Sequence, residues 1–256
     1  MRAIQFTEHG PIENLHVAES PLPQVAPGQC LLKVKAVSLN GFDPMVLQGI
    51  PGLRTPLPMI PGADISAEIA ELGAGVDSAR FAIGQRVGVN PSNASGMMGE
   101  TALGGLCEFI AVDAAQLVPV PDAVDDLAAA CLPTAYATAH RMLFTRGDVR
   151  PGEKILILGA SGGVGTGCIQ LAKMAGCEVI AVTSNAQKGQ RLREIGADHV
   201  IDTTTTPFVD YVIDTFGKPR TRGETGGVGV GLRLSVEARS AEVGAAEVGV
   251  AAVGAA

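Results

Sequence analysis

Hydrophobic and polar residues follow different patterns in the two halves of the chain. Up to about residue 125, short apolar runs of the kind found in β-strands are separated by Gly and Pro. These runs are MRAIQF, CLLKVKAVSLN, ADISAEIAEL, QRVGVN, CEFIAV and QLVPV. Many short strands separated by turn residues predict a compact, mostly β domain over residues 1–125.

Near residue 122 the pattern changes to DAVDDLAAACLPTAYATAHRMLF, which is rich in Ala. The segment lacks β-branched runs apart from scattered Val and Thr, and it is predicted to be helical. Asp122 is the candidate N-cap. Pro133 is expected to break the helix, because proline has no N–H group to donate.

From residue 154 onward, strands and helices are predicted to alternate. KILILGA, CEVIAVTS and ADHVID are the predicted strands, and the two helices between them end at Gly176 and Gly196. This alternation is typical of one half of a doubly wound parallel sheet. The fold class is therefore α/β, with a mostly β domain followed by a partial Rossmann domain over residues 126–218.

A third helix is predicted in TTPFVDYVIDTFGKP. Thr206 is its candidate cap, and Pro207 suits the first turn of a helix. The apolar residues Phe208, Tyr211, Val212 and Phe216 are predicted to share one face, as expected for a helix that covers a sheet.

The last segment, residues 219–256, is dominated by Gly, Ala and Val. Its end repeats every five residues as AEVGA, AEVGV and AAVGA. A period of five matches neither a helix nor a strand, so no single apolar face forms. We expect this low-complexity tail to be disordered, although GVGVGLRLSV alternates in a way that could make one strand.

Composition narrows the functional class. Only 18% of the residues are charged and the net charge is −7, which argues against binding to nucleic acid. No apolar run approaches the roughly 20 residues needed to span a bilayer, and the first residues lack the apolar core of a signal peptide. We expect a soluble cytoplasmic protein with no membrane partner. The five cysteines form no CxxC pair and are expected to act as small apolar residues.

The segment GASGGVG joins the predicted strand KILILGA to the helix that follows it and is the candidate cofactor site. Aligned on the fingerprint G-x-G-x-x-G, Ala160 takes the first glycine position, Gly162 the second and Gly165 the third. The second glycine lets backbone N–H groups approach a pyrophosphate, and the third lets the helix pack closely on the strand. A chance glycine-rich turn is the alternative, but the strand–helix–strand context favours dinucleotide binding. The predicted cofactor-binding residues here are Ala160, Ser161, Gly162, Gly163, Val164 and Gly165.

The end of the second strand distinguishes between the two nicotinamide cofactors. An NAD site usually has an acidic residue about 20 residues beyond the glycines, whereas this sequence reads VTSNAQK. The hydroxyl groups of Thr183 and Ser184 and the ammonium group of Lys188 suit the 2′-phosphate of NADP (NADPH). The alternative is that Lys188 is an ordinary surface residue and that Ser184 or Asn185 caps the helix.

Taken together, these segments resemble the medium-chain dehydrogenase/reductase superfamily, and within it the zinc-free quinone oxidoreductase and enoyl reductase branch. The resemblance covers about residues 1–218 and includes PGADISAEIAELGAGV, RFAIGQRVGVNP, AACLPTAYATA and GASGGVGTGCIQLAK, in the family's order. It implies a GroES-like catalytic domain, a Rossmann domain and a small-molecule substrate bound between them. Family members often form dimers, so a homodimer is a candidate assembly.

The resemblance also bears on metal binding and on the reaction. Zinc-dependent relatives bind the metal with two Cys and one His, and these positions correspond to Asn40, Ala63 and Thr134. Because no thiolate or imidazole stands there, no metal is expected. The implied reaction is hydride transfer from NADPH to a quinone or an α,β-unsaturated carbonyl.

The resemblance places the candidate catalytic residues Asn40 and Thr134 near the nicotinamide, with Asp43 in the same loop as Asn40. The alternatives are that Asn40 and Asp43 only cap the turn at Gly41, and that Thr134 caps a helix. Tyr136 and His140 are further candidate acids, although such residues in an Ala-rich helix more often have packing roles.

The resemblance ends before the family's Rossmann domain is complete. Residues 154–202 supply only strands 3, 2 and 1 of the order 3-2-1-4-5-6. KILILGA is then expected to lie at an uncovered sheet edge. One hypothesis for the tail is that the chain is a frameshifted or mis-spliced gene product. The alternative function for the chain is then that of an inactive remnant, which binds nucleotide weakly or acts as an interaction module.

Overall fold

The structure is a computed structural model that describes residues 1–94, 96–216, 219–220 and 249–253. The chain divides into two compact units, Met1–Thr134 and Ala135–Ala256. This division lies later along the chain than the change in composition at residue 125. The reason is that α2 (Asp126–Ala130) is attached to the first unit. Asp126 Oδ1 accepts hydrogen bonds from Ser66 Oγ at 2.9 Å and from Arg86 Nη2 at 3.0 Å.

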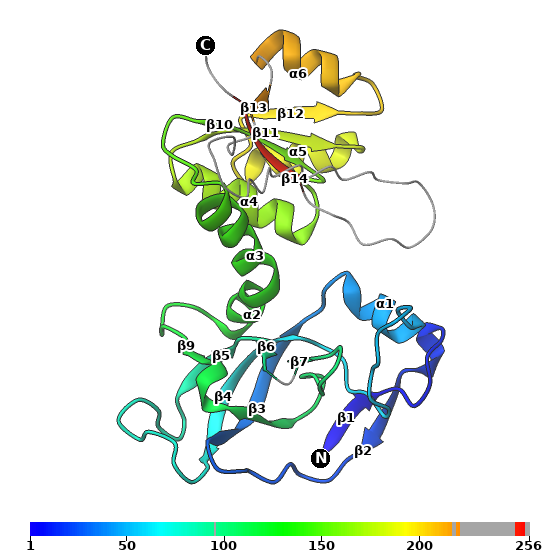
Figure 1. Cartoon of the computed structure of the whole chain (residues 1–256), viewed down its shortest axis with the longest axis vertical. Coiled ribbons are helices and arrows are strands. Elements are labelled where there is room, and N and C mark those ends of the chain that lie inside the picture. Colours follow the sequence, from blue (N-terminus) through cyan, green and yellow to red (C-terminus); the bar gives the residue numbers. More distant parts are fainter. Residues whose placement is uncertain (95, 217–218, 221–248, 254–256) are drawn as a thin grey trace. The chain divides into compact units, whose positions relative to one another are not determined.

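The first unit contains an antiparallel sheet with the strand order β8-β3-β4-β5-β9 (Figure 1). Each of the predicted β segments contains a strand. The sheet consists of β3 (Gln29–Ser38), β4 (Asp64–Leu72), β5 (Arg86–Val89), β8 (Phe109–Asp113) and β9 (Leu117–Pro119). Smaller elements are β1 (Arg2–Gln5), β2 (His16–Glu19), α1 (Phe42–Gln48), β6 (Ser92–Asn93), β7 (Gly96–Met97) and 3₁₀ turns at Ile12–Asn14 and Ala114–Gln116.

Period-two alternation builds the core of this unit. Every second residue of β4 from Ile65 to Ile69 is fully buried, and Leu32 and Val87 on the neighbouring strands are buried as well. Burial of such side chains contributes about 25 cal/mol per Å² of apolar surface removed from water. This packing fixes the register of β4, whose first residue, Asp64, is part of the candidate site described below.

The helical stretch after residue 122 differs in detail from the prediction. Its N-cap is Asp125 and not Asp122, because Asp125 has extended backbone angles and its carboxylate accepts from Ala128 N at 2.7 Å. At Pro133 the helix passes into a π-helical turn, Leu132–Tyr136, since proline cannot donate the regular helical hydrogen bond. A short α3 (Ala137–His140) and a second π-helical turn, Arg141–Arg146, follow.

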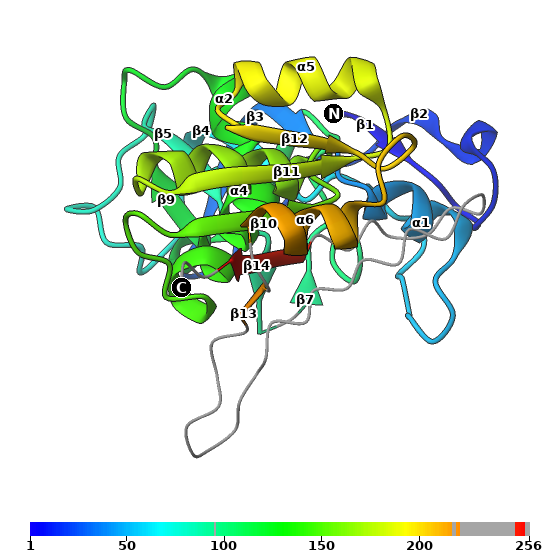
Figure 2. The ribbon, with the colours of Figure 1, turned by 90° about the horizontal axis from the view of Figure 1, so that it is seen from above.

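The second unit contains the sheet β12-β11-β10-β14-β13. The strands β10 (Lys154–Leu158), β11 (Glu178–Thr183) and β12 (His199–Asp202) are parallel, which confirms the predicted half of a doubly wound sheet. Figure 2 shows these strands side by side. The helices of this unit are α4 (Gly163–Met174), α5 (Ala186–Glu194) and α6 (Phe208–Phe216).

The expectation that β10 lies at an uncovered edge is wrong for the described backbone. Strand β14 (Gly249–Val253) pairs antiparallel with β10, from Lys154 opposite Val253 to Leu158 opposite Gly249, and β13 (Pro219–Arg220) pairs with β14. An open strand edge presents N–H and C=O groups that any extended segment can bind, so even a Gly/Ala/Val repeat can serve as the partner. The candidate strand GVGVGLRLSV lies outside the described residues.

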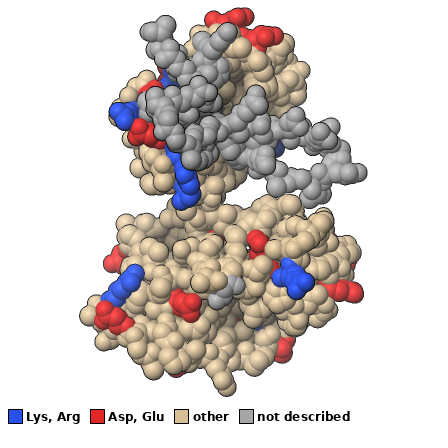
Figure 3. Space-filling view, in the orientation of Figure 1, with Lys and Arg blue, Asp and Glu red and all other residues tan. Residues whose placement is uncertain are grey.

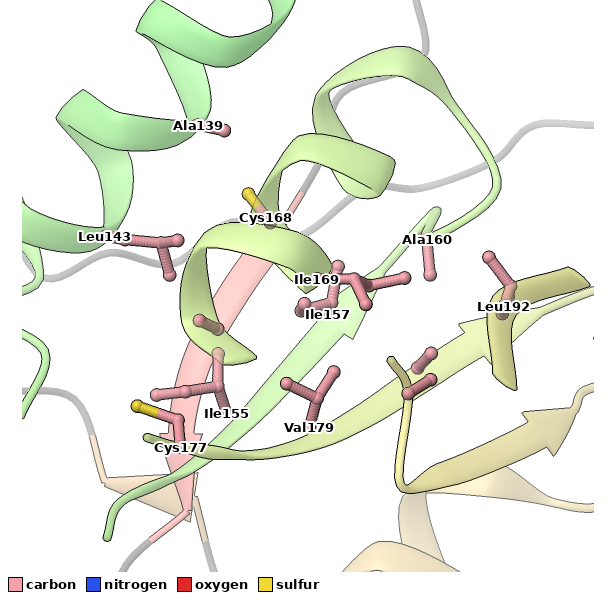
Figure 4. Packing of buried hydrophobic residues seen from close by; sticks show 13 residues of the cluster. Ala139, Leu143, Ile155, Ile157, Ala160, Cys168, Ile169, Cys177, Val179 and Leu192 are labelled. Atoms are coloured by element: carbon pink, nitrogen blue, oxygen red, sulfur yellow. The ribbon is translucent and has the colours of Figure 1, made fainter. Parts of the chain in front are cut away.

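Helices cover both faces of the parallel strands. On one face, Cys168 and Ile169 of α4 pack between Leu143 and the strand residues Ile155 and Ile157 (Figure 4). On the other face, α6 buries Val212, with Phe208 and Phe216 partly buried. Tyr211 departs from the predicted shared face, because 44% of its surface is exposed.

On the face of the molecule that Figure 3 shows, basic side chains do not gather into a patch. Where described atoms are visible in Figure 3, the Lys and Arg side chains lie apart from one another. Among the described residues, no helix combines the length and apolarity that crossing a bilayer requires.

The cysteines are all free, and they differ in burial. Cys30, Cys168 and Cys177 are buried, and burial raises the pKa of the Cys168 thiol to about 12. Cys107 is partly buried and Cys131 is exposed, so Cys131 is not part of the apolar core.

Candidate functional site

The glycine-rich corner begins where β10 ends. Gly159 has a φ of +60°, a left-handed conformation that favours glycine, and its carbonyl accepts from Gly162 N at 3.0 Å. The tight turn therefore depends on Gly159. Ala160, which takes the first glycine position in the sequence alignment, is instead fully buried in the core of the unit.

Gly165 lies where α4 packs against this corner. A Cβ atom added at Gly165 would lie 2.7 Å from both Ala160 Cα and Gly159 O. Both are backbone positions that cannot move aside cheaply. Glycine at this position therefore lets the helix pack closely on the strand.

Gly162 lies in different surroundings. Among the described residues, a Cβ atom added there would meet only Gly159 O, at the ordinary contact distance of 3.5 Å, and the Gly162 φ of −81° is open to any residue. Packing within the chain therefore does not require glycine at this position. No other described residue fills the space in front of Gly162, and Ser161 and Gly163 beside it are exposed.

Gly162 is the N-cap of α4 and offers no side chain to cap the helix. The first N–H groups of a helix have no partner within it, so those of Gly163 and Val164 are available to an acceptor, and the helix N-terminus adds partial positive charge. Open space in front of such donors suits the phosphate groups of a dinucleotide.

At the end of β11, the predicted cofactor residues have different exposures. Thr183 is 5% exposed, and its Oγ1 is a buried atom without a hydrogen-bond partner in the described part of the chain. Such an atom costs about 1–3 kcal/mol. Ser184 and Lys188 are exposed, and no ion pair among the described residues involves Lys188. The residue that caps α5 is Asn185, whose Oδ1 accepts from Lys188 N at 3.1 Å.

In the first unit, Asp64 brings the two candidate catalytic residues together. Asn40 Nδ2 donates to Asp64 Oδ2 at 3.1 Å. Thr134 Oγ1 donates to Asp64 Oδ1 at 2.6 Å, and Thr134 N lies 3.1 Å from both carboxylate oxygens. Asp64 itself is only 1% exposed.

Asp43 stabilises the same loop by accepting hydrogen bonds from the backbone. Its Oδ2 accepts from Asn40 N at 2.6 Å, and its Oδ1 accepts from Gly62 N at 3.2 Å. Asp43 therefore acts as the turn-capping residue that the alternative interpretation described. The side chains of Asn40 and Thr134 do not act as caps, because both contact Asp64.

Burial governs the two carboxyl groups of this cluster. It raises the pKa of Asp43 and of Asp64, although the hydrogen bonds that each accepts act in the opposite direction. Sequence reasoning missed Asp64. The available signal was an acidic residue at the start of the otherwise apolar strand segment ADISAEIAEL.

Tyr136 and His140 take packing positions. Tyr136 Oη donates to Gln170 Oε1, and the Tyr136 ring lies against Gly167, which attaches the helical segment to α4. His140 is exposed and packs on the ring of Phe144, with the ring centres 4.9 Å apart.

The side chains at the positions of zinc ligands in zinc-dependent relatives do not fit that metal. Asn40 and Thr134 use their N–H and O–H groups to donate to Asp64, and Ala63 has no donor atom. Neutral oxygens are poor substitutes for thiolate and imidazole. Within the described residues there is also no group of three or more His, Cys, Asp or Glu that could hold a metal ion.

Comparison with known proteins gives two matching family models. The alcohol dehydrogenase GroES-like domain matches residues 26–122, and the zinc-binding dehydrogenase model matches residues 163–252. Among curated proteins, the chain is 34% identical to the synaptic vesicle membrane protein VAT-1 homolog of Rattus norvegicus, over 83% of this chain and 50% of that protein. It is 33% identical to the chloroplastic NADPH-dependent alkenal/one oxidoreductase of Arabidopsis thaliana, over 82% of this chain and 54% of that protein. The chain thus spans about half the length of these relatives.

Solved structures give the same picture. A structure described as an NAD-dependent alcohol dehydrogenase matches with a TM-score of 0.80 and 31% identity, covering 85% of this chain and 68% of the other. A quinone oxidoreductase of Pseudomonas syringae pv. Tomato DC3000 matches with a TM-score of 0.75 and 30% identity, covering 85% of this chain and 63% of the other.

Proposed function

The chain belongs to the medium-chain dehydrogenase/reductase family, and on this basis we propose that it is an oxidoreductase that binds NADPH. We propose further that it reduces a quinone or an α,β-unsaturated carbonyl compound without zinc. The relatives named for an alkenal/one activity and for a quinone activity support this substrate class. Both classes contain a carbonyl group conjugated to a double bond.

The observation that carries the proposal is the open space at Gly162. The positive φ favours glycine at Gly159 and close packing requires it at Gly165, but among the described residues neither reason applies at Gly162. A glycine that packing does not require, in front of free helical N–H groups, fits the close approach of a pyrophosphate. The residues that would hold the cofactor there are Ser161 and the backbone of Gly162, Gly163 and Val164.

The preference for NADPH over NADH rests on the end of β11. The names of the relatives include both an NADPH-dependent and an NAD-dependent enzyme, so family membership alone does not decide the cofactor. At this chain's β11 terminus, Ser184 and Lys188 offer an exposed hydroxyl group and an exposed ammonium group, whereas the hydroxyl group of Thr183 is buried. A phosphate gains from these donors, whereas an NAD site would use a carboxylate at this place.

When bound, NADPH supplies the hydride, and the protein supplies orientation and a hydrogen-bond donor for the carbonyl oxygen of the substrate. Negative charge develops on that oxygen as the double bond is reduced. A donor fixed in advance stabilises this charge without reorganisation. Asn40 is our candidate for this donor.

The test is a titration of the purified chain with NADPH and with NADH, followed by turnover with a simple quinone and a simple enone. We expect tighter binding of NADPH, and NADPH oxidation that depends on the substrate. Binding without turnover would favour the alternative of a nucleotide-binding remnant. Binding of neither nucleotide would refute the proposal for this chain.

A further inference from the structure

Asp64 has an arrangement that the proposed reaction does not by itself explain. It is a carboxylate at the start of a core strand, 1% exposed, and it forms no ion pair among the described residues. Removing a charge from water without a cationic partner is costly. The hydrogen bonds that it accepts all come from Asn40 and Thr134, which are distant from it in sequence.

An ionised carboxylate only accepts hydrogen bonds, and this fixes the direction of each bond it makes. The side-chain amide of Asn40 must turn its NH₂ group, and not its carbonyl oxygen, towards Asp64. The hydroxyl group of Thr134 has a single proton, and at a distance of 2.6 Å that proton points at Asp64 Oδ1. Asp64 therefore determines which polar atoms of both residues remain available.

The two residues are left with different capacities. One of the two N–H bonds of Asn40 Nδ2 is used by Asp64, so the other can donate to a further acceptor. Thr134 Oγ1 has no second proton and can only accept. Asp43 holds the backbone of Asn40 through the 2.6 Å bond from Asn40 N, so the amide starts from a fixed position.

We propose that Asp64 is a positioning residue that orients the Asn40 amide, so that its second N–H is the donor to the substrate oxygen, while Thr134 serves as an anchor and not as a proton donor. This inference rests on the proposed reductase function. It gives Asn40 and Thr134 different roles, although the sequence analysis predicted both as catalytic residues.

The kinetic test compares Asp64→Asn, Asn40→Ala and Thr134→Val, with Ser66→Ala as the control. Ser66 is a buried polar residue on the same strand, and its hydroxyl donates to Asp126 and not to this cluster. We expect Asn40→Ala to lower kcat by about 100-fold, the scale for loss of one donor to a developing oxyanion. Asp64→Asn should lower kcat by about tenfold or more, with the KM for NADPH unchanged. An amide at position 64 can both donate and accept hydrogen bonds, so it would no longer fix which end of the Asn40 amide faces it.

A double variant tests whether Asp64 acts through Asn40. In the Asn40→Ala background, Asp64→Asn should have little additional effect on kcat, since Asp64 acts through Asn40. Thr134→Val should lower kcat only a few-fold, and Asp64→Glu, which keeps the carboxylate, should retain more activity than Asp64→Asn. Full activity of Asp64→Asn, multiplicative losses in the double variant, or a Thr134→Val loss equal to that of Asn40→Ala would each overturn the proposal.

A second measurement does not depend on turnover and separates this inference from the proposed function. In the chain labelled with ¹⁵N-asparagine, the chemical shifts of the two Nδ2 protons of Asn40 should be separated more widely than those of an exposed asparagine, because only one of the two is hydrogen-bonded to a carboxylate. Asp64→Asn should reduce this separation, and Ser66→Ala should not. Unchanged Asn40 amide resonances in Asp64→Asn would overturn the positioning role even if the chain reduces no substrate tested.

Discussion

The glycine-rich corner of the second unit (residues 159–165) and the Asp64 cluster of the first unit (Asn40, Asp43, Asp64 and Thr134) differ in how far their polar groups are paired within the chain. At the corner, Gly162 faces open space and the N–H groups of the first helical turn are left without partners in the helix. In the cluster, the carboxylates of Asp43 and Asp64 take up donors from Asn40, Gly62 and Thr134. The first arrangement is suited to receiving a ligand, and the second to holding side chains in fixed orientations. We interpret the shortage of internal partners at the corner as the mark of a binding surface, and the internal pairing in the cluster as the mark of positioning.

Among the substitutions that test this difference, Gly165→Ala should have the largest effect, and the quantity that it changes is the free energy of unfolding. The added methyl group would lie 2.7 Å from backbone atoms of Gly159 and Ala160, so α4 or the corner must move. Overpacking of this kind costs about 1–3 kcal/mol of unfolding free energy. Urea unfolding of the variant measures this loss. A variant as stable as the wild type would show that the corner is not tightly packed and would remove the contrast with Gly162.

The two sites differ in how much of them the sequence predicts. The corner could be predicted because its requirements fall on consecutive residues between a strand and a helix. The order of β10, β11 and β12 could be predicted for the same reason, since each strand and helix has its own hydrophobic period. The pairing of β14 with β10 could not, because backbone hydrogen bonds form with little regard to side chains.

The Asp64 cluster could be predicted only in part. Resemblance to the family identified Asn40 and Thr134, but their common partner Asp64 is 24 residues from one and 70 from the other. Such contacts are created by the folded sheet and leave no local pattern. The cap at Asp125 was missed for a smaller reason: three aspartates lie within five residues, and only backbone angles decide which one caps.

A smaller effect is expected from Lys188→Ala, which tests whether the end of β11 recognises a phosphate. Removing the ammonium group should weaken binding of NADPH by about tenfold and leave NADH unchanged, since a charge-assisted bond is worth about 1.4 kcal/mol or more. Arg191→Ala on the same helix is the matched control, because it removes the same charge from an exposed position farther from the strand end. Equal losses in both variants would indicate only a general electrostatic effect.

The pH dependence of stability gives the smallest effect and separates the two units. Burial raises the pKa of Asp64, so between the ordinary aspartate value of about 3.9 and the raised value the folded chain binds more protons than the unfolded chain. In that window the unfolding free energy falls as the pH rises. Glu178 in the second unit behaves oppositely, because its hydrogen bond with Lys154 lowers its pKa, and its contribution is lost as the pH falls below about 4.3.

Unfolding free energies measured from pH 3 to pH 7 should therefore change differently in two variants. Asp64→Asn should reduce the fall in stability that accompanies rising pH just above pH 3.9, and Glu178→Gln should reduce the loss on acidification. If both variants changed the profile in the same direction, the contrast between the buried cluster and the paired surface carboxylate would be wrong.

The most direct test of the central claim, that the corner is open because a dinucleotide occupies it, is a titration of NADPH into the wild type, Gly162→Ala and Gly88→Ala. The added methyl group meets no described atom closer than 3.5 Å at Gly162 or 3.9 Å at Gly88, so neither variant should lose its fold through a steric clash. We predict that Gly162→Ala weakens NADPH binding by about 100-fold or more, because the methyl group occupies the space of the pyrophosphate, and that Gly88→Ala binds as the wild type does. Equal binding by all three proteins would contradict the account.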